Sequence, residues 1–230
     1  MTIADRLAEV RRRILTATES AGREPGSVKL IAAGKTFPAE KLCQAMAAGA
    51  TDFGENRVQE AVLKIPRVPG ATWHLIGPLQ RNKARSALEV FDVVHTVDRL
   101  EIADRLQFLL EERWPERRLP VTVEINLGSE PQKAGAAPEK AETLLRHALG
   151  CDRLAVLGLM AVPPWSSDPE ATRPYFRSLR ELRDRLEQAT GASLPELSMG
   201  MSHDFEVAIA EGATMIRVGT AIFGARGLGG

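Results

Sequence analysis

The chain alternates between two hydrophobic patterns along its length. Ile3, Leu7, Val10 and Ile14 recur at intervals of three and four residues, which predicts an amphipathic helix that ends near Gly22. After it come eight short apolar runs of strand length, separated by seven segments with helical spacing. The predicted strands lie at 27–35, 50–56, 72–77, 92–98, 119–128, 154–162, 196–202 and 214–224.

Regular alternation of this kind is typical of a parallel sheet whose strands are joined by crossover helices. Eight consecutive units favour closure of the sheet, so we predict an α/β fold, a single-domain (β/α)8 TIM barrel with an extra N-terminal helix. An open doubly wound sheet would give the same alternation and is the alternative. No linker or change in composition divides the chain, so residues 1–230 are predicted to form one domain.

Charge and cysteine content narrow the possible partners. The 30 basic and 30 acidic side chains cancel, so the chain lacks the excess positive charge of a nucleic-acid or anionic-membrane binder. Segment 1–22 mixes acids and arginines with apolar residues, unlike a signal peptide or a membrane span. Cys43, Cys151 and the scattered histidines show no metal-ligand spacing, and two cysteines are too few for a disulfide scaffold. We therefore expect a cytoplasmic protein with no metal, nucleic-acid or membrane partner.

A single lysine, Lys35, ends the first predicted strand within "LIAAGKTFP". Side chains alternate along a strand, so Ile31, Ala33 and Lys35 share one face. In a barrel of this type the carboxyl ends of the strands, here called the mouth, carry the chemistry. If this face points inward, the amine loses hydration in the mouth, which favours its neutral form, a nucleophile towards carbonyl groups. A lysine that simply reaches solvent is the alternative.

Two glycine-containing segments follow the seventh and eighth predicted strands, where phosphate sites of such barrels usually lie. In "LSMGMSHD", Gly200 allows close backbone approach, and Ser198 and Ser202 offer hydroxyl groups. In "RVGTAIFG", Gly219 and Thr220 do the same at the start of a helical segment. Either segment alone is ordinary turn and helix-cap chemistry, but together they predict one phosphate site.

A Schiff-base lysine facing a phosphate site suggests pyridoxal 5'-phosphate (PLP), which carries an aldehyde and a phosphate on one ring. A Schiff-base aldolase acting on a phosphosugar would use the same two groups. Composition does not separate these two hypotheses.

Six segments, taken in chain order, carry a family resemblance: "GKTFP", "FGENRVQEAVLK", "WHLIGPLQRNK", "LGLMAVPP", "LSMGMSHDFEVAI" and "GATMIRVGTAIFGAR". They are similar to the signature segments of the YggS/PROSC family of pyridoxal phosphate homeostasis proteins, barrels that resemble the N-terminal domain of alanine racemase. The resemblance implies that Lys35 holds PLP as a Schiff base. The other residues that it implies for the cofactor site are Asn56, His74, Ile76, Ser198, Met199, Gly200, Ser202, Arg217, Gly219 and Thr220.

Arg217 shares a strand face with Met215 and Gly219, so it is predicted to point towards the same space as the phosphate segments. The resemblance to alanine racemase places it beside the pyridine nitrogen of the cofactor. A guanidinium keeps its proton in a protein, so that nitrogen would stay unprotonated and the cofactor would be a poor electron sink. A structural arginine paired with an acid is the alternative.

The resemblance also bears on activity. A racemase of this type needs a second base from an added β domain that 230 residues do not accommodate, and the only tyrosine, Tyr175, is a poor substitute. We therefore predict a monomeric PLP-binding protein of intracellular PLP homeostasis and delivery, not an enzyme, with apo PLP-dependent enzymes as possible acceptors. A PLP-dependent, racemase-like enzyme is the alternative.

Two positions within the resemblance are noteworthy. Gly34 stands where many relatives have serine or threonine before the lysine, which removes a hydroxyl group near the Schiff base. Lys133, in "GSEPQKAG", matches a lysine that is common in the family and is predicted to lie near the mouth. A solvated loop lysine is an equal alternative for Lys133.

Overall fold

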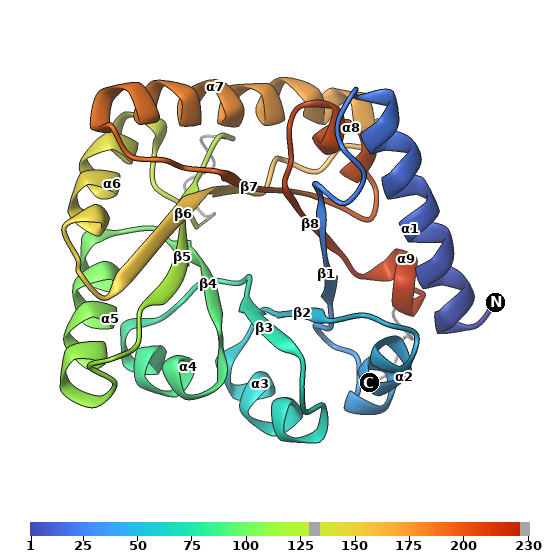
Figure 1. Cartoon of the computed structure of the whole chain (residues 1–230), viewed down its shortest axis with the longest axis horizontal. Coiled ribbons are helices and arrows are strands. Elements are labelled where there is room, and N and C mark those ends of the chain that lie inside the picture. Colours follow the sequence, from blue (N-terminus) through green and yellow to red (C-terminus); the bar gives the residue numbers. More distant parts are fainter. Residues whose placement is uncertain (129–133, 226–230) are drawn as a thin grey trace.

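Eight parallel strands form a closed barrel in the computed structural model, which describes residues 1–128 and 134–225 (Figure 1). Each strand pairs with the next one in sequence, and β8 pairs with β1 to close the sheet. The strands are β1 (Lys29–Ala33), β2 (Asp52–Glu55), β3 (Thr72–Leu75), β4 (Val93–Val97), β5 (Leu119–Ile125), β6 (Leu154–Ala161), β7 (Glu196–Met201) and β8 (Met215–Val218). The predicted (β/α)8 barrel is confirmed, and the open doubly wound alternative is wrong.

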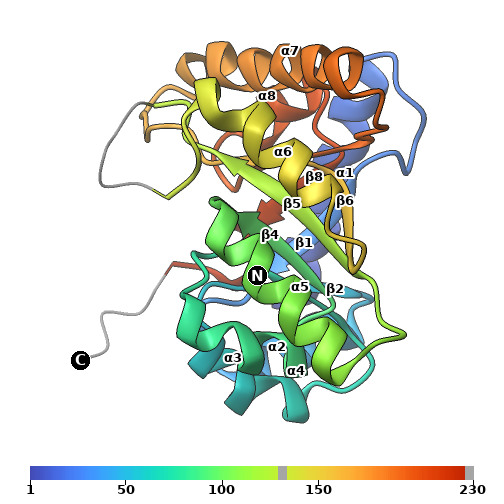
Figure 2. The same ribbon diagram turned by 90° about the vertical axis from the view of Figure 1, so that its left-hand side faces the viewer.

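Helices surround the barrel on its outside (Figures 1 and 2). Successive strands are connected by α2 (Ala39–Ala47), α3 (Val58–Lys64), α4 (Ala84–Val90), α5 (Leu100–Arg113), α6 (Ala141–Leu149), α7 (Arg173–Thr190) and α8 (Phe205–Ala210). Short 3-10 turns accompany them at η1 (Ile65–Arg67), η2 (Arg81–Lys83), η3 (Pro138–Lys140) and η4 (Pro169–Thr172). A last short helix, α9 (Thr220–Phe223), follows β8.

The predicted N-terminal helix is α1 (Ile3–Ser20), and it covers the seam between β1 and β8. Its first turn is a capping box, in which Thr2 and Asp5 each accept the other's backbone amide through their side chains. The buried Leu7 and Val10 lie on one face, and the helix packs against α8 and α9. Together with α8 and α9, α1 therefore covers the outside of the barrel where β8 pairs with β1. The helices α2 to α8 connect successive strands and do not bridge this pair.

The apolar core lies between the sheet and the helices, not inside the barrel. Phe53 and Trp73 point outward into this layer, with ring centroids 5.5 Å apart. Because side chains alternate along a strand, the neighbouring Gly54 and His74 face inward. Each large side chain buried in the outer layer contributes roughly 1.5–3 kcal/mol. The interior of the barrel is therefore free to hold polar side chains.

No helix in the described part of the chain is both long enough and apolar enough to cross a membrane.

Candidate cofactor-binding site

Lys35 lies in a tight turn just beyond β1, not within the strand. The strand ends at Ala33, and the Gly34 carbonyl then accepts the Phe37 amide at 3.0 Å instead of continuing the sheet. Thr36 adopts a left-handed conformation with φ of 67°, which costs a residue other than glycine about 1–3 kcal/mol. The half-buried Lys35 is thus held at the mouth by a strained turn. The predicted strand was two residues too long at this end.

A buried ion pair supports this turn from the side of the helices. Glu55, fully buried at the end of β2, contacts Lys64 of α3 with 2.6 Å between Oε1 and Nζ. The same ammonium donates to the Gly34 carbonyl at 3.0 Å. Burial raises the pKa of Glu55, and Lys64 opposes that rise. Lys64 therefore joins the backbone next to Lys35 to a charge on the neighbouring strand.

The ion pair also explains why glycine fits at position 34. A Cβ atom added to Gly34 would lie 2.8 Å from Leu42 Cδ2 and 2.9 Å from Glu55 Oε1. Real Cβ atoms do not approach heavy atoms so closely, so a serine or threonine here would require Glu55 and Leu42 to move. Gly34 thus allows Leu42 and Glu55 to pack closely against the backbone of this turn.

Replacing Lys64 with methionine is expected to destabilise the fold by about 3 kcal/mol at pH 8, because it leaves the buried Glu55 carboxylate unpaired. The pKa of Glu55 would rise further above its unfolded value, so the loss should be small near pH 5 and grow as the pH rises. Urea unfolding of the variant and of the wild-type protein at pH 5 and pH 8 measures this loss of stability. The double variant Lys64→Met, Glu55→Gln should recover most of the stability, and a loss that does not depend on pH would contradict this role.

A continuous line of hydrogen bonds crosses the interior of the barrel. Asp52 Oδ1 lies 3.0 Å from His74 Nε2, and His74 Nδ1 lies 2.9 Å from His95 Nε2. His95 Nδ1 lies 2.8 Å from the Ser198 hydroxyl, which accepts a hydrogen bond from Arg217 at 2.7 Å. The line joins β2, β3, β4, β7 and β8, so it connects opposite sides of the barrel.

The partners at the two ends of this line assign its proton positions. Arg217 only donates, so the Ser198 hydroxyl must use its own hydrogen towards His95 Nδ1. His95 then carries its proton on Nε2 and donates to His74, which in turn donates through Nε2 to the Asp52 carboxylate. Burial, with the charges of His74 and Arg217, lowers the pKa of His95 well below its usual value and keeps it neutral. Every polar atom in the line is satisfied, which holds the Arg217 head group in place.

Arg217 is the main charged group inside the barrel. It is buried, and its second terminal nitrogen donates to the Ala161 carbonyl at 3.0 Å. Burial lowers the pKa of Arg217 to about 10, against the opposing effect of Glu124 and Asp204. The guanidinium therefore remains charged at neutral pH.

The loops after β7 and β8 meet at the mouth, as the sequence indicated. The Ser202 hydroxyl accepts the backbone amides of Gly219 at 3.1 Å and Ala221 at 3.3 Å, so it joins the β7 loop to the start of α9. Thr220 is exposed at the first position of α9. Gly200 has φ of 93°, and the bend there brings the chain back towards Phe205.

Other predicted site residues lie at different depths. Ile76 follows β3, and its Cδ1 atom would lie 2.7 Å from a Cβ on Gly54, so Ile76 reaches into the barrel above His74. Asn56 follows β2 and lines a hollow of about 590 Å³ together with residues of α3 and Lys83 of η2. Met199 packs in the outer apolar layer, so only its backbone is available to the mouth.

The structure thus separates the predicted residues into two groups. At the mouth, Gly219 lies against Ala33 at the end of β1, so the turn that holds Lys35 and the loop of Ser202, Gly219 and Thr220 follow neighbouring strands of the closed barrel. Deeper inside, His74 and Ser198 bond other side chains and position Arg217. Lys133 lies outside the described residues.

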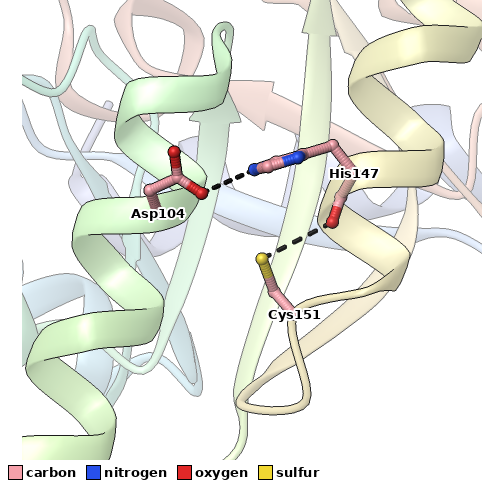
Figure 3. Close-up of side chains that lie close together, drawn as sticks. All are labelled: Asp104, His147 and Cys151. Atoms are coloured by element: carbon pink, nitrogen blue, oxygen red, sulfur yellow. Dashed lines mark hydrogen bonds and ion pairs between the residues drawn. The ribbon is translucent and has the colours of Figure 1, made fainter.

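A second cluster lies away from the mouth, between α5 and the end of α6 (Figure 3). His147 Nε2 contacts Asp104 Oδ1 at 2.6 Å, and the Cys151 thiol donates to the His147 carbonyl at 3.5 Å. One ligand-type atom from each residue lies within 4.8 Å of the others. His147 therefore has neighbours of metal-ligating type that its sequence spacing did not indicate. The His147–Asp104 contact joins α5 to α6, whereas the weak hydrogen bond of the Cys151 thiol stays at the end of α6.

Sequence reasoning missed Glu55, Lys64 and Glu124. The signal for Glu124 was present as polar residues alternating with apolar ones in "VTVEI", the pattern that His95 shows in "VVHTV". In a barrel strand the apolar positions of such a pattern face the helices and the polar ones face the interior. Lys64 gave no such signal, since a lysine on a helix is usually solvated.

Comparison with known proteins defines the class of this barrel. The family model "Alanine racemase, N-terminal domain" matches residues 6–227. The structure also resembles an alanine racemase of Clostridium difficile, with a TM-score of 0.66 and 15% identity over 92% of this chain and 55% of that one. At that identity the likeness shows the fold alone.

Curated relatives are much more similar. A pyridoxal phosphate homeostasis protein of Aquifex aeolicus is 43% identical over 98% of this chain and 99% of its own length. One from Pseudomonas aeruginosa is 44% identical over 99% and 97%, respectively. The solved structure of PipY from Synechococcus elongatus with PLP bound has a TM-score of 0.84 and 39% identity, covering 97% of this chain and 100% of that one. The chain belongs to the family of pyridoxal phosphate homeostasis proteins.

Proposed function

We propose that this chain binds PLP as a Schiff base on Lys35 and acts in PLP homeostasis and delivery within the cytoplasm. The proposal rests on the arrangement of two segments at the mouth. One is the turn after β1 that holds Lys35, and the other is the loop region after β7 and β8 that holds Ser202, Gly219 and Thr220. The charged, buried Arg217 lies deeper in the barrel, in register with Ile31 of β1 and Met201 of β7. The PLP-bound structure of PipY, which is 39% identical, supports PLP as the ligand.

The residues present fit the chemical groups of PLP. PLP supplies an aldehyde, which a primary amine can trap, and a phosphate, which backbone amides and hydroxyl groups can bind. Lys35 would provide the amine. Ser202, Gly219 and Thr220 would bind the phosphate, with Gly200 and the Met199 backbone shaping the loop. Arg217 would face the ring from the interior, and Asn56 and Ile76 would border it on the side of β2 and β3.

Arg217 favours retention of the cofactor over amino-acid turnover. It donates to Ser198 and Ala161 and keeps its own proton, so it would offer the ring nitrogen no acid. Tyr175, the only tyrosine in the sequence, lies in the first turn of α7. We propose that the chain acts as a monomer that passes PLP to apo enzymes. The alternative, racemase-like chemistry, is favoured only by the likeness to the alanine racemase fold.

The experiment that separates these functions follows the α-proton of amino acids. Protein loaded with PLP should be yellow and should exchange no α-proton with deuterated solvent across a panel of amino acids. It should also restore the activity of an apo PLP-dependent enzyme mixed with it. Exchange at a catalytic rate would overturn the assignment as a carrier and favour the enzyme.

A further inference from the structure

Glu124 is a buried acid inside the barrel that the contacts described so far do not use. Val121, Val123 and Ile125 of β5 belong to the outer apolar layer, so the alternating position of Glu124 faces the interior. Glu124 is the second-last residue of the strand and lies in register with Met160 of β6. It therefore sits near the mouth, on the same side of the fold as the proposed PLP site.

The Glu124 side chain is only partly satisfied. The residue is 6% exposed, and its Oε2 atom has no hydrogen-bond partner among the residues that the structure describes. A buried polar atom without a partner costs free energy, and in native proteins it usually marks a bound ligand, a water or a functional role. Burial raises the pKa of Glu124 to about 7, with a further rise from Asp98 and an opposing effect of Arg217.

The charged groups around Glu124 explain why it is the acid that would change state. Arg217 of β8 and Asp98, just after β4, act on Glu124, whereas Asp204, in the loop after β7, acts on Arg217. Asp98 contacts Arg99 at 2.6 Å, and Asp204 accepts the Met201 amide at 2.7 Å. The neighbouring histidine, His95, is neutral. Burial raises the pKa of Asp98 and of Asp204 as well, but Arg99 and the Met201 amide favour their charged forms, whereas the described residues give Glu124 Oε2 no partner.

A phosphate-bearing ligand adds about 1.5–2 negative charges at neutral pH. It would enter a mouth where Asp98 already acts on Glu124 and where Glu124 shares Arg217 with Asp204. The added charge disfavours the carboxylate form of the least compensated acid. Resting on the function proposed above, we infer that Glu124 takes up a proton from solvent when PLP binds, and returns it when PLP leaves. The Glu124 carboxylate becomes a carboxylic acid, whose O–H is then available as a hydrogen-bond donor.

The consequence is a release that depends on pH. Since the bound state holds one more proton at Glu124 than the free state, a rise in pH above neutrality should favour release, by up to about tenfold per pH unit. The titrations of the cofactor and of Lys35 also contribute, but they are the same in wild-type protein and in a Glu124 variant. The ratio of their affinities therefore isolates Glu124.

Isothermal titration calorimetry of PLP into apo protein at pH 8, in two buffers of different ionisation enthalpy, counts the protons taken up. Wild-type protein and the Glu139→Gln variant, which removes an exposed acid in η3, should take up about one proton more per PLP than Glu124→Gln. Glu124→Asp should keep the uptake. Equal uptake by wild type and Glu124→Gln would overturn the inference while leaving Lys35 and PLP binding intact.

Infrared difference spectroscopy on the wild-type protein covers the case in which Glu124→Gln does not fold. PLP binding should produce the carbonyl band of a protonated carboxyl group, and its absence would count against the inference. Failure of the proposed function looks different, because wild-type protein would then bind no PLP at Lys35.

Discussion

Lys35→Ala protein is expected to be colourless and to lose PLP on gel filtration. Without the amine no Schiff base forms, and only the loop and Arg217 contacts remain to hold the phosphate and the ring. We expect the affinity for PLP to fall at least a hundredfold, or about 3 kcal/mol. The fold should persist, because Lys35 lies in a turn outside the apolar core. Absorbance spectra and equilibrium dialysis measure the two effects.

Lys29→Ala is the matched control for this experiment. Lys29 is the first residue of β1, at the opposite end of the barrel from Lys35, and its exposed ammonium lies 3.6 Å from Asp52. Its loss should leave colour and affinity unchanged, since a long ion pair made by an exposed lysine contributes little. A Lys35→Ala protein that stays yellow and retains PLP would refute the assignment of Lys35.

Replacing Arg217 with methionine should have the second large effect. It removes the cation that faces Glu124 and Asp204 and leaves the Ser198 hydroxyl and the Ala161 carbonyl without their donor. Removal of one partner from a buried charged group destabilises a protein by about 3–5 kcal/mol. The variant should also bind PLP more weakly, because the line of hydrogen bonds that ends at Arg217 loses its last donor.

The loss of stability in the Arg217→Met variant should depend on pH. Without Arg217 the pKa values of Glu124 and Asp204 rise further above their unfolded values, so stability falls as the pH increases from 6 to 8. Adding Glu124→Gln to Arg217→Met should recover part of the loss at pH 8 and little at pH 6. Urea unfolding of the single and double variants tests this. Equal stability of Arg217→Met and wild type would contradict the role of Arg217.

The barrel could be predicted from the sequence because its strands and helices carry local signals. Helical spacing from Ile3 to Ile14 and the short apolar runs after it were enough to give the element order. The end of β1 was less predictable. The chain turns away from the sheet after Ala33, because the Gly34 carbonyl accepts the Phe37 amide and Thr36 adopts a left-handed conformation. A left-handed position usually carries glycine, and this one carries threonine, so the sequence gives no clear sign of the turn.

The interior was harder to predict for a geometric reason. His95 and Ser198 are 103 positions apart, yet they bond inside the barrel because both side chains point inward from β4 and β7. Periodicity shows which side of a strand a residue lies on, but not which residue it meets across a closed sheet. Ser198 was therefore predicted from its neighbours as a phosphate-site residue, whereas its hydroxyl bonds His95 and Arg217.

Borohydride reduction of the PLP-loaded protein, followed by proteolysis and mass spectrometry, tests the central claim most directly. Reduction converts a Schiff base into a stable bond, so the amine that held the aldehyde stays labelled. We predict one phosphopyridoxyl group, on the peptide that contains Lys35. A label on a different lysine, or protein of unchanged mass, would contradict the account.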